Sequence, residues 1–183
     1  MAIRVSELHH HLETERLILR TWRPSDLDEY AAMFAEPEVA QFLSIDGKPM
    51  THADAWRSLA SVIGHWHLRG YGMFAVIERA SGELAGRIGP LEPEGWPDFE
   101  IGWGLRRKFW GRGYAIEAVK ACIAYAFTEL NKTHLISIID PMNEKSIRVA
   151  QRVGETLEGE TSLPAWPGKR LLKYGLHRSD WQQ

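Results

Sequence analysis

The chain has 183 residues, a formal net charge of -2 at pH 7 and a single cysteine. Charged residues make up 25% of it and hydrophobic residues 44%, which are ordinary globular values and argue against a disordered chain. The near-neutral charge argues against a nucleic-acid surface, and one cysteine excludes an internal disulfide. Because the sequence has no long apolar run and no cleavable signal, we expect a cytoplasmic protein without a membrane span.

The first twelve residues have the character of a leader. We expect residues 1–12 to be flexible and residues 13–183 to form one domain, because no linker, repeat or low-complexity tract divides them. The leader contains His9, His10 and His11, but no ligand partner accompanies them at metal spacing. We therefore expect no metal.

Periodicity predicts the elements of the first half. Alternation predicts a strand at 17–22, and apolar residues at helical spacing predict one helix from residue 25 to about residue 34 and a second over 51–69, with a loop at 36–49 between them. Strands are then expected at 71–78, at 84–89 and from residue 99. Three strands in such quick succession predict a meander.

The central strand has two unlike faces. From residue 99 to residue 105, large apolar side chains alternate with Glu100, Gly102 and Gly104. One face is therefore expected to be buried. The other should be a bare trough in which Glu100 is the sole ionisable group and a ligand can lie against the backbone.

A glycine turn follows this strand and opens a helix that begins near Tyr114. Gly111-Arg112-Gly113 would direct backbone N–H groups and the positive end of the helix dipole at an anion, with phosphate as the natural guest. A dinucleotide fingerprint would need a third glycine at Ile116, and a P-loop would need Gly-Lys-Ser/Thr, so both fit poorly. A tight turn without any ligand is the other interpretation of these glycines.

The last third is expected to alternate strands and a helix. A buried strand at 135–139 stops at Asp140-Pro141, and Asn143 is positioned to cap a helix that reaches Val153. Strands at 156–163 and 171–177 would close the chain around a loop at 166–168.

The turn Lys108-Phe109-Trp110-Gly111-Arg112-Gly113 resembles the coenzyme A turn of the GNAT superfamily of N-acetyltransferases, Gln/Arg-x-x-Gly-x-Gly/Ala, with Lys108 as a departure at the first position. The resemblance extends from E-T-E-R-L-I-L-R near the start to K-Y-G-L-H-R-S-D-W at the end, and it is strongest with the ribosomal-protein N-terminal acetyltransferases of RimJ/RimL type. It implies an α/β (α+β) fold with a mixed, mostly antiparallel sheet of about seven strands and four flanking helices. In that fold the central strand and the strand at 135–139 splay apart to admit the pantetheine arm of the coenzyme.

The resemblance also implies acetyl-coenzyme A as co-substrate and an amine as acceptor. The residues expected to bind the coenzyme are Trp103, Leu105, Arg106, Lys108, Trp110, Gly111, Arg112, Gly113, Tyr114, Ala115, Asn143 and Ser146.

Two residues are expected to move protons. Glu100 is the predicted general base because it lies on the glycine face; its alternatives are an exposed strand carboxylate and a salt-bridge partner for the substrate. The resemblance places Asn143 and Ser146 where relatives face the pantetheine and thiol, so Ser146 is the predicted donor to the departing thiolate. Many relatives use a tyrosine further along the helix for this step, and no tyrosine occurs here between Asn143 and Gly154. Glu155 departs from the aromatic residue that relatives place after the glycine that ends this helix.

We therefore expect an acetyl-coenzyme A-dependent N-acetyltransferase that acts on a primary amine, of a protein N-terminus or of a small molecule, by direct attack in a ternary complex. The alternatives are a non-catalytic acyl-coenzyme A sensor and a nucleotide-binding regulator. Because dimers are common among such relatives, a homodimer is a further expected association.

Overall fold

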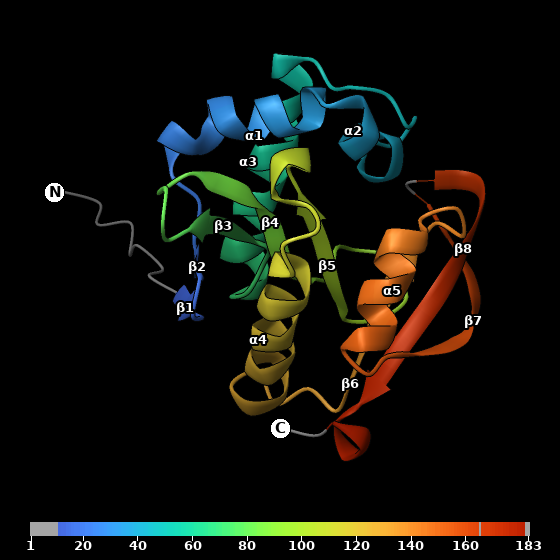
Figure 1. The fold of residues 1–183 in the computed structure, drawn as a ribbon. Helices are drawn as coiled ribbons and strands as arrows, with labels where there is room; N and C mark the ends of the chain where they lie inside the picture. The colour runs from blue at the N-terminus through green and yellow to red at the C-terminus, as the bar shows by residue number, and fades with distance from the viewer. Residues whose placement is uncertain (1–10, 165, 182–183) are drawn as a thin grey trace, which may run out of the picture.

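The computed structural model describes residues 11–164 and 166–181, which form one eight-stranded sheet and five α-helices (Figure 1). The strands are β1 (His11–Glu13), β2 (Leu17–Arg20), β3 (Phe74–Glu78), β4 (Leu84–Leu91), β5 (Glu100–Leu105), β6 (His134–Ile139), β7 (Thr156–Leu163) and β8 (Trp166–His177). The helices are α1 (Leu27–Ala35), α2 (Pro37–Leu43), α3 (His52–Arg69), α4 (Tyr114–Thr128) and α5 (Glu144–Arg152).

The sheet opens in its middle. Its strand order is β1-β2-β3-β4-β5-β6-β8-β7, and every neighbouring pair is antiparallel except β5 with β6. The register of that parallel pair is confined to Glu100 and Ile136. Beyond this point the strands separate, and the Ser137 Oγ atom lies 2.8 Å from the Ile101 carbonyl oxygen across the gap. The predicted splay is therefore confirmed.

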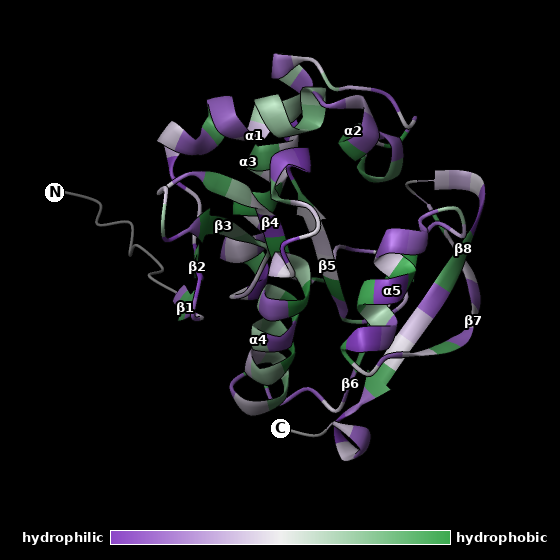
Figure 2. Cartoon of the chain, in the orientation of Figure 1, coloured by the Kyte–Doolittle hydropathy of each residue, from purple (hydrophilic) through white to green (hydrophobic). Residues whose placement is uncertain are grey.

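Helices cover both faces of the sheet. Helix α4 packs on one face, where Ile101 and Val119 belong to the same buried cluster. Helices α1 and α3 pack on the other, where Phe34 and Leu59 surround Ala75 of β3. Helix α5 lies beside α4 over β6 and β8 (Figure 1), and hydrophilic and hydrophobic residues alternate along it, as expected for a helix with one buried face (Figure 2).

Several boundaries differ from the sequence predictions. Helix α2 occupies the first half of the expected 36–49 loop, and β8 begins at Trp166, so that the expected 166–168 loop belongs to a strand. Strand β1 pairs His11 with Arg20 and Leu12 with Leu19, so these last two residues of the expected leader belong to the sheet. Residues 1–10 lie outside the described part of the chain.

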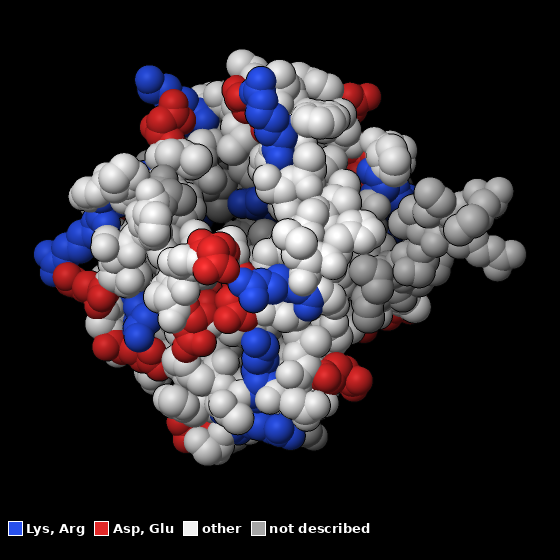
Figure 3. Space-filling model, turned by 180° about the vertical axis from the view of Figure 1, so that it is seen from behind, with Lys and Arg blue, Asp and Glu red and all other residues white. Residues whose placement is uncertain are grey.

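Within the described ranges, no helix combines the length and apolarity that a membrane crossing requires. Seen from behind, Lys and Arg side chains are interspersed with Asp and Glu, and the face is hollowed near its centre (Figure 3).

Candidate active site

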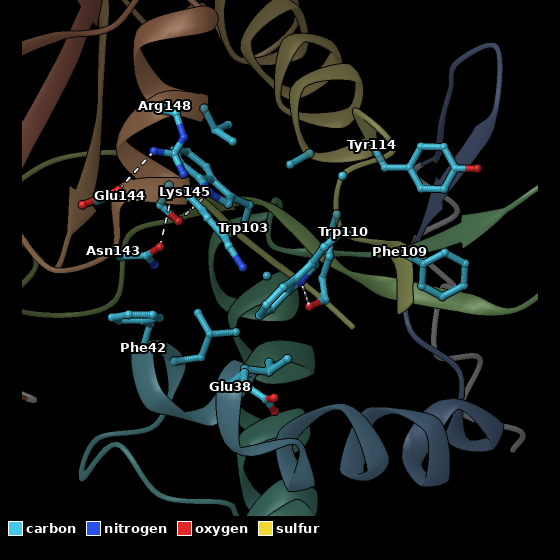
Figure 4. A pocket seen from close by; sticks show the side chains of 18 of the residues that line it. Glu38, Phe42, Trp103, Phe109, Trp110, Tyr114, Asn143, Glu144, Lys145 and Arg148 are labelled. Atoms are coloured by element: carbon cyan, nitrogen blue, oxygen red, sulfur yellow. Dashed lines mark hydrogen bonds and ion pairs between the residues drawn. The ribbon is translucent and has the colours of Figure 1, made fainter. Parts of the chain in front are cut away.

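A cavity of about 850 Å³ opens between α2, the end of β5, the start of α4 and the start of α5 (Figure 4). Its volume falls in the range of small-molecule and cofactor sites. Its lining brings together most residues that the sequence predicts for coenzyme binding, namely Trp103, Leu105, Trp110, Gly111, Gly113, Tyr114, Ala115, Asn143 and Ser146.

The glycine turn has the backbone that an anion site needs. Gly111 and Gly113 have φ of 76° and 80°, in the left-handed region that side chains other than glycine rarely adopt. Gly113 is the N-cap of α4, so no side-chain cap accepts from the first-turn N–H groups of the helix. Tyr114 and Ala115 of that turn line the cavity. The positive end of α4 therefore faces the cavity.

The basic side chains of the turn lie elsewhere. Arg106, Lys108 and Arg112 are not part of the cavity lining, and each makes an ion pair with a glutamate. These pairs join Arg106 to Glu29 at 3.2 Å, Lys108 to Glu83 at 2.7 Å and Arg112 to Glu78 at 3.1 Å. The structure thus does not bring these three predicted residues to the cavity.

Cations reach the cavity from α5 instead. Lys145, Arg148 and Arg152 line it, and the Lys145 Nζ atom lies 4.1 Å from the centre of the Trp110 ring (Figure 4). The sequence analysis missed these residues, although their spacing of three and four positions places them on one face of the predicted helix.

Helix α2 supplies the other wall that the sequence analysis missed. Phe42 lies across the cavity from α5 (Figure 4), and Leu43 also lines the cavity. Pro37 at the first turn was the available signal, because its fixed φ favours a helix start.

Ser146 is held by two neighbours. The Asn143 side chain accepts from the Ser146 backbone N–H at 3.2 Å, which confirms the predicted N-cap. The Trp103 Nε1–H donates to Ser146 Oγ at 3.1 Å. Because the indole can only donate, the Ser146 hydroxyl accepts this bond and keeps its own proton for another acceptor.

Glu100 lies on the face of β5 opposite to that of Trp103, and it is 6% exposed. Its carboxylate accepts from Trp96 Nε1 at 2.6 Å and from the Ile138 backbone N–H at 3.3 Å. Burial raises the pKa of Glu100 to about 7, while these two bonds and the charge of Arg87 oppose the rise. A carboxyl with this pKa can exchange a proton near neutral pH.

The face around Glu100 is less open than predicted. The side chain of Leu43 occupies the space beside Gly104, where a Cβ atom would overlap it. A Cβ on Gly102 would lie 3.0 Å from a Leu91 methyl group. The expected bare trough is therefore partly filled, and the glycines accommodate neighbouring side chains.

A second buried carboxyl lies near the splay. Glu155 is 3% exposed, and its pKa is raised to about 8 by burial, with a further contribution from Glu100. Ser137 Oγ lies 2.8 Å from the Ile101 carbonyl oxygen and 2.9 Å from Glu155 Oε1, but its one proton serves only one of them. A neutral Glu155 can supply the second proton, which agrees with the raised pKa.

Comparison with known proteins decides the family. The model of the acetyltransferase (GNAT) domain matches residues 16–156. The chain belongs to the GNAT acetyltransferase family. This confirms the resemblance to the RimJ/RimL-type GNAT enzymes and the enzyme class, an N-acetyltransferase.

Individual GNAT relatives agree with this assignment. The chain is 32% identical over 151 residues to the Bacillus licheniformis protein named uncharacterized N-acetyltransferase p20, covering 81% of this chain and 83% of that one. An acetyltransferase from Agrobacterium tumefaciens has the same fold, with a TM-score of 0.81, 32% identity and coverage of 92% and 95%. The ribosomal-protein-S5-alanine acetyltransferase from Vibrio fischeri shares the fold at a TM-score of 0.70 and 20% identity, covering 95% of this chain and 100% of that one.

The cavity fits the acetyl-coenzyme A that GNAT membership implies. The phosphates of this coenzyme are anionic, and the cavity offers them the start of α4 and the cations of α5. Its aromatic walls at Trp103 and Trp110 suit the less polar pantetheine arm.

Proposed function

We propose that this GNAT enzyme transfers an acetyl group from acetyl-coenzyme A directly to a primary amine, either a protein N-terminus or a small molecule, in a ternary complex. The coenzyme supplies an acetyl group that is activated as a thioester. The protein then has to deprotonate the amine and protonate the leaving thiolate.

The relationship that carries this proposal is the placement of Glu100 and Ser146 on opposite sides of the splay. Ser146 lines the cavity, and Glu100 lies on the other face of β5, at the single register pair that joins β5 to β6. An acceptor that approaches from the Glu100 side would meet the coenzyme through the gap between the strands.

Glu100 accepts the proton of the amine, because its raised pKa makes the carboxylate a stronger base and still leaves part of it deprotonated near pH 7. Ser146 donates its free hydroxyl proton to the thiolate. The chain's single cysteine is unsuited to forming a covalent acyl-enzyme, since Cys122 is buried in α4 and burial raises the pKa of its thiol. A cytoplasmic location and a homodimeric state stay predictions of the sequence.

The test measures free coenzyme A release from acetyl-coenzyme A with a panel of N-terminal peptides, polyamines and amino acids, together with mass spectrometry of the acceptors. We expect amine-dependent release matched by an equal amount of acetylated acceptor. Binding of acetyl-coenzyme A in a calorimetric titration without release for any amine class would support the non-catalytic sensor instead.

A further inference from the structure

Two histidines and a glutamate meet where β6, β7 and β8 lie side by side (Figure 1), outside the residues that line the cavity. His134 begins β6, Glu158 belongs to β7 and His177 ends β8. Their candidate ligand atoms all lie within 4.8 Å of one another. The Glu158 Oε1 atom is 2.7 Å from His134 Nε2 and 4.0 Å from His177 Nε2.

The sheet register brings the two imidazoles together. His134 and His177 are direct cross-strand partners in the antiparallel β6–β8 pair. Their rings stack with centroids 4.3 Å apart. Glu158 reaches the same point because Gly175 has no side chain, and a Cβ atom there would overlap the Glu158 carboxylate.

His134 is oriented as metal-binding histidines are. Its Nδ1 atom lies 2.7 Å from Asp98 Oδ2, and because a carboxylate accepts, Nδ1 carries the proton. The Nε2 atom lies 2.7 Å from Glu158 Oε1, so it also carries a proton in the metal-free protein, and a metal ion would displace that proton. A carboxylate that fixes the second nitrogen of a histidine ligand is the usual outer-shell arrangement of zinc sites.

Zinc would replace the hydrogen bond between His134 Nε2 and Glu158 Oε1, and the nearby lysine contacts the other carboxylate oxygen. Lys173 Nζ lies 3.3 Å from Glu158 Oε2, the other oxygen of the carboxylate. Ligand atoms about 2 Å from a zinc ion are about 3.3 Å apart in tetrahedral geometry. The His177 ring must therefore move inward by roughly 1 Å, and the 2.7 Å separation of His134 Nε2 from Glu158 Oε1 must widen. The His177 ring must also turn out of its stack on His134, and its side chain, 60% exposed, is free of the packing that would prevent this.

We propose that His134 Nε2, Glu158 Oε1 and His177 Nε2 bind a zinc ion, with a fourth position open to water. Two imidazoles and one carboxylate form a donor set that zinc prefers. The site would join the β7–β8 hairpin to β6. Through Asp98, whose Oδ1 accepts from the Phe99 backbone N–H at 2.8 Å, it would also fix the residues that precede Glu100. The sequence analysis expected no metal because the N-terminal histidines lack a partner at metal spacing, and it did not consider these three residues, which come from distant segments.

Zinc titration of the metal-free full-length protein tests the proposal. Calorimetry should find one more zinc equivalent per chain for the wild type than for His177→Ala. Asp98→Asn should weaken the affinity of that equivalent roughly 10- to 100-fold, the usual cost of losing an outer-shell partner. The matched control is His67→Ala, which removes an exposed histidine of α3 outside the cluster and should bind as the wild type does.

Comparing variants cancels any zinc that the N-terminal histidines hold, because every variant retains them. A cobalt titration adds a second readout, since the visible absorption of a tetrahedral cobalt site should appear in the wild type and vanish in His177→Ala. Equal zinc stoichiometry for the wild type and His177→Ala, or an equal loss in His67→Ala, would overturn the proposal.

Discussion

The indole Nε1–H of Trp96 donates to Glu100 Oε2 at 2.6 Å. This bond stabilises the charged form of the carboxyl and opposes the rise in its pKa that burial causes. Trp96 therefore lowers the pKa of the proposed base Glu100 from the value that burial alone would give, without itself belonging to the cavity lining.

Trp96→Phe keeps an aromatic ring but removes the donor. The pKa of Glu100 should then rise above about 7, and the acid limb of the kcat/KM profile should move to higher pH in the same direction. Trp166→Phe is the matched control, because Trp166 packs against Trp96 but donates to the Ser44 carbonyl oxygen. An acid limb that is identical in the wild type and Trp96→Phe would mean that another group controls it.

The cations of α5, rather than those of the glycine turn, should contribute to coenzyme affinity. Lys145 lines the cavity, whereas Lys108 is paired with Glu83 outside it. We expect Lys145→Ala to weaken coenzyme A binding about two- to fivefold at low salt, because an exposed ion pair contributes up to about 1 kcal/mol. Added salt should reduce the difference. Lys108→Ala should bind coenzyme A as the wild type does. If calorimetric titrations show a larger loss of affinity for Lys108→Ala than for Lys145→Ala, the glycine turn and not α5 holds the phosphates.

Substitutions of Ser146 and Asn143 should change different properties, the first turnover and the second stability. Ser146→Ala should lower kcat more than it lowers acetyl-coenzyme A affinity, because it removes the proton donor. Asn143→Ala should lower the free energy of unfolding by about 0.5 to 2 kcal/mol, because it removes the N-cap of α5. Steady-state kinetics and urea unfolding measure the two effects, and a Ser146→Ala enzyme with full kcat would exclude the hydroxyl as the donor.

Glu155 should make the wild type less stable as pH rises. Its pKa is about 8 in the folded protein, above the value of about 4.3 for an unperturbed glutamate, so the folded state holds a proton that the unfolded chain has lost. The resulting stability is fully present below pH 4 and is lost as pH rises through 8. Glu155→Gln stays neutral, so its stability should fall less between pH 5 and pH 8 in urea unfolding.

The raised pKa of Glu100 leaves some of this pH dependence in the Glu155→Gln variant. The exposed Glu144 provides the control, since Glu144→Gln should keep the wild-type slope. If the free energy of unfolding of Glu155→Gln falls with pH as steeply as that of the wild type, Glu155 is charged in the folded protein.

The sequence predicted those features that local patterns determine. The alternation of residues 99–105, the helix start at Tyr114 and the Asn143 cap each depend on neighbours in sequence, and each is found in the structure. The short elements β1 and α2 were not predicted, because a strand of three residues or a helix of seven residues provides too little periodicity.

Features that depend on distant partners could not be predicted. The ion pair of Lys108 with Glu83 and the contact of Leu43 with Gly104 join segments that are far apart in sequence. The first contact holds Lys108, a predicted phosphate ligand, outside the cavity, and the second fills part of the predicted trough. A basic residue beside a glycine turn therefore does not by itself predict a phosphate ligand, because an acidic residue from a distant segment can pair with it.

The pH dependence of Glu100→Gln tests the central claim most directly. Glutamine keeps the size of the side chain but cannot take a proton from the amine, so we expect acetyl-coenzyme A binding to be preserved. We expect kcat to fall roughly 10²- to 10⁴-fold near pH 7, the usual contribution of a positioned general base. The defect should shrink as pH rises, because the free amine then forms without help, and the acid limb that Glu100 causes should disappear. An equal loss of kcat at every pH, or a change confined to the KM for the amine, would show that Glu100 anchors the substrate and is not the base.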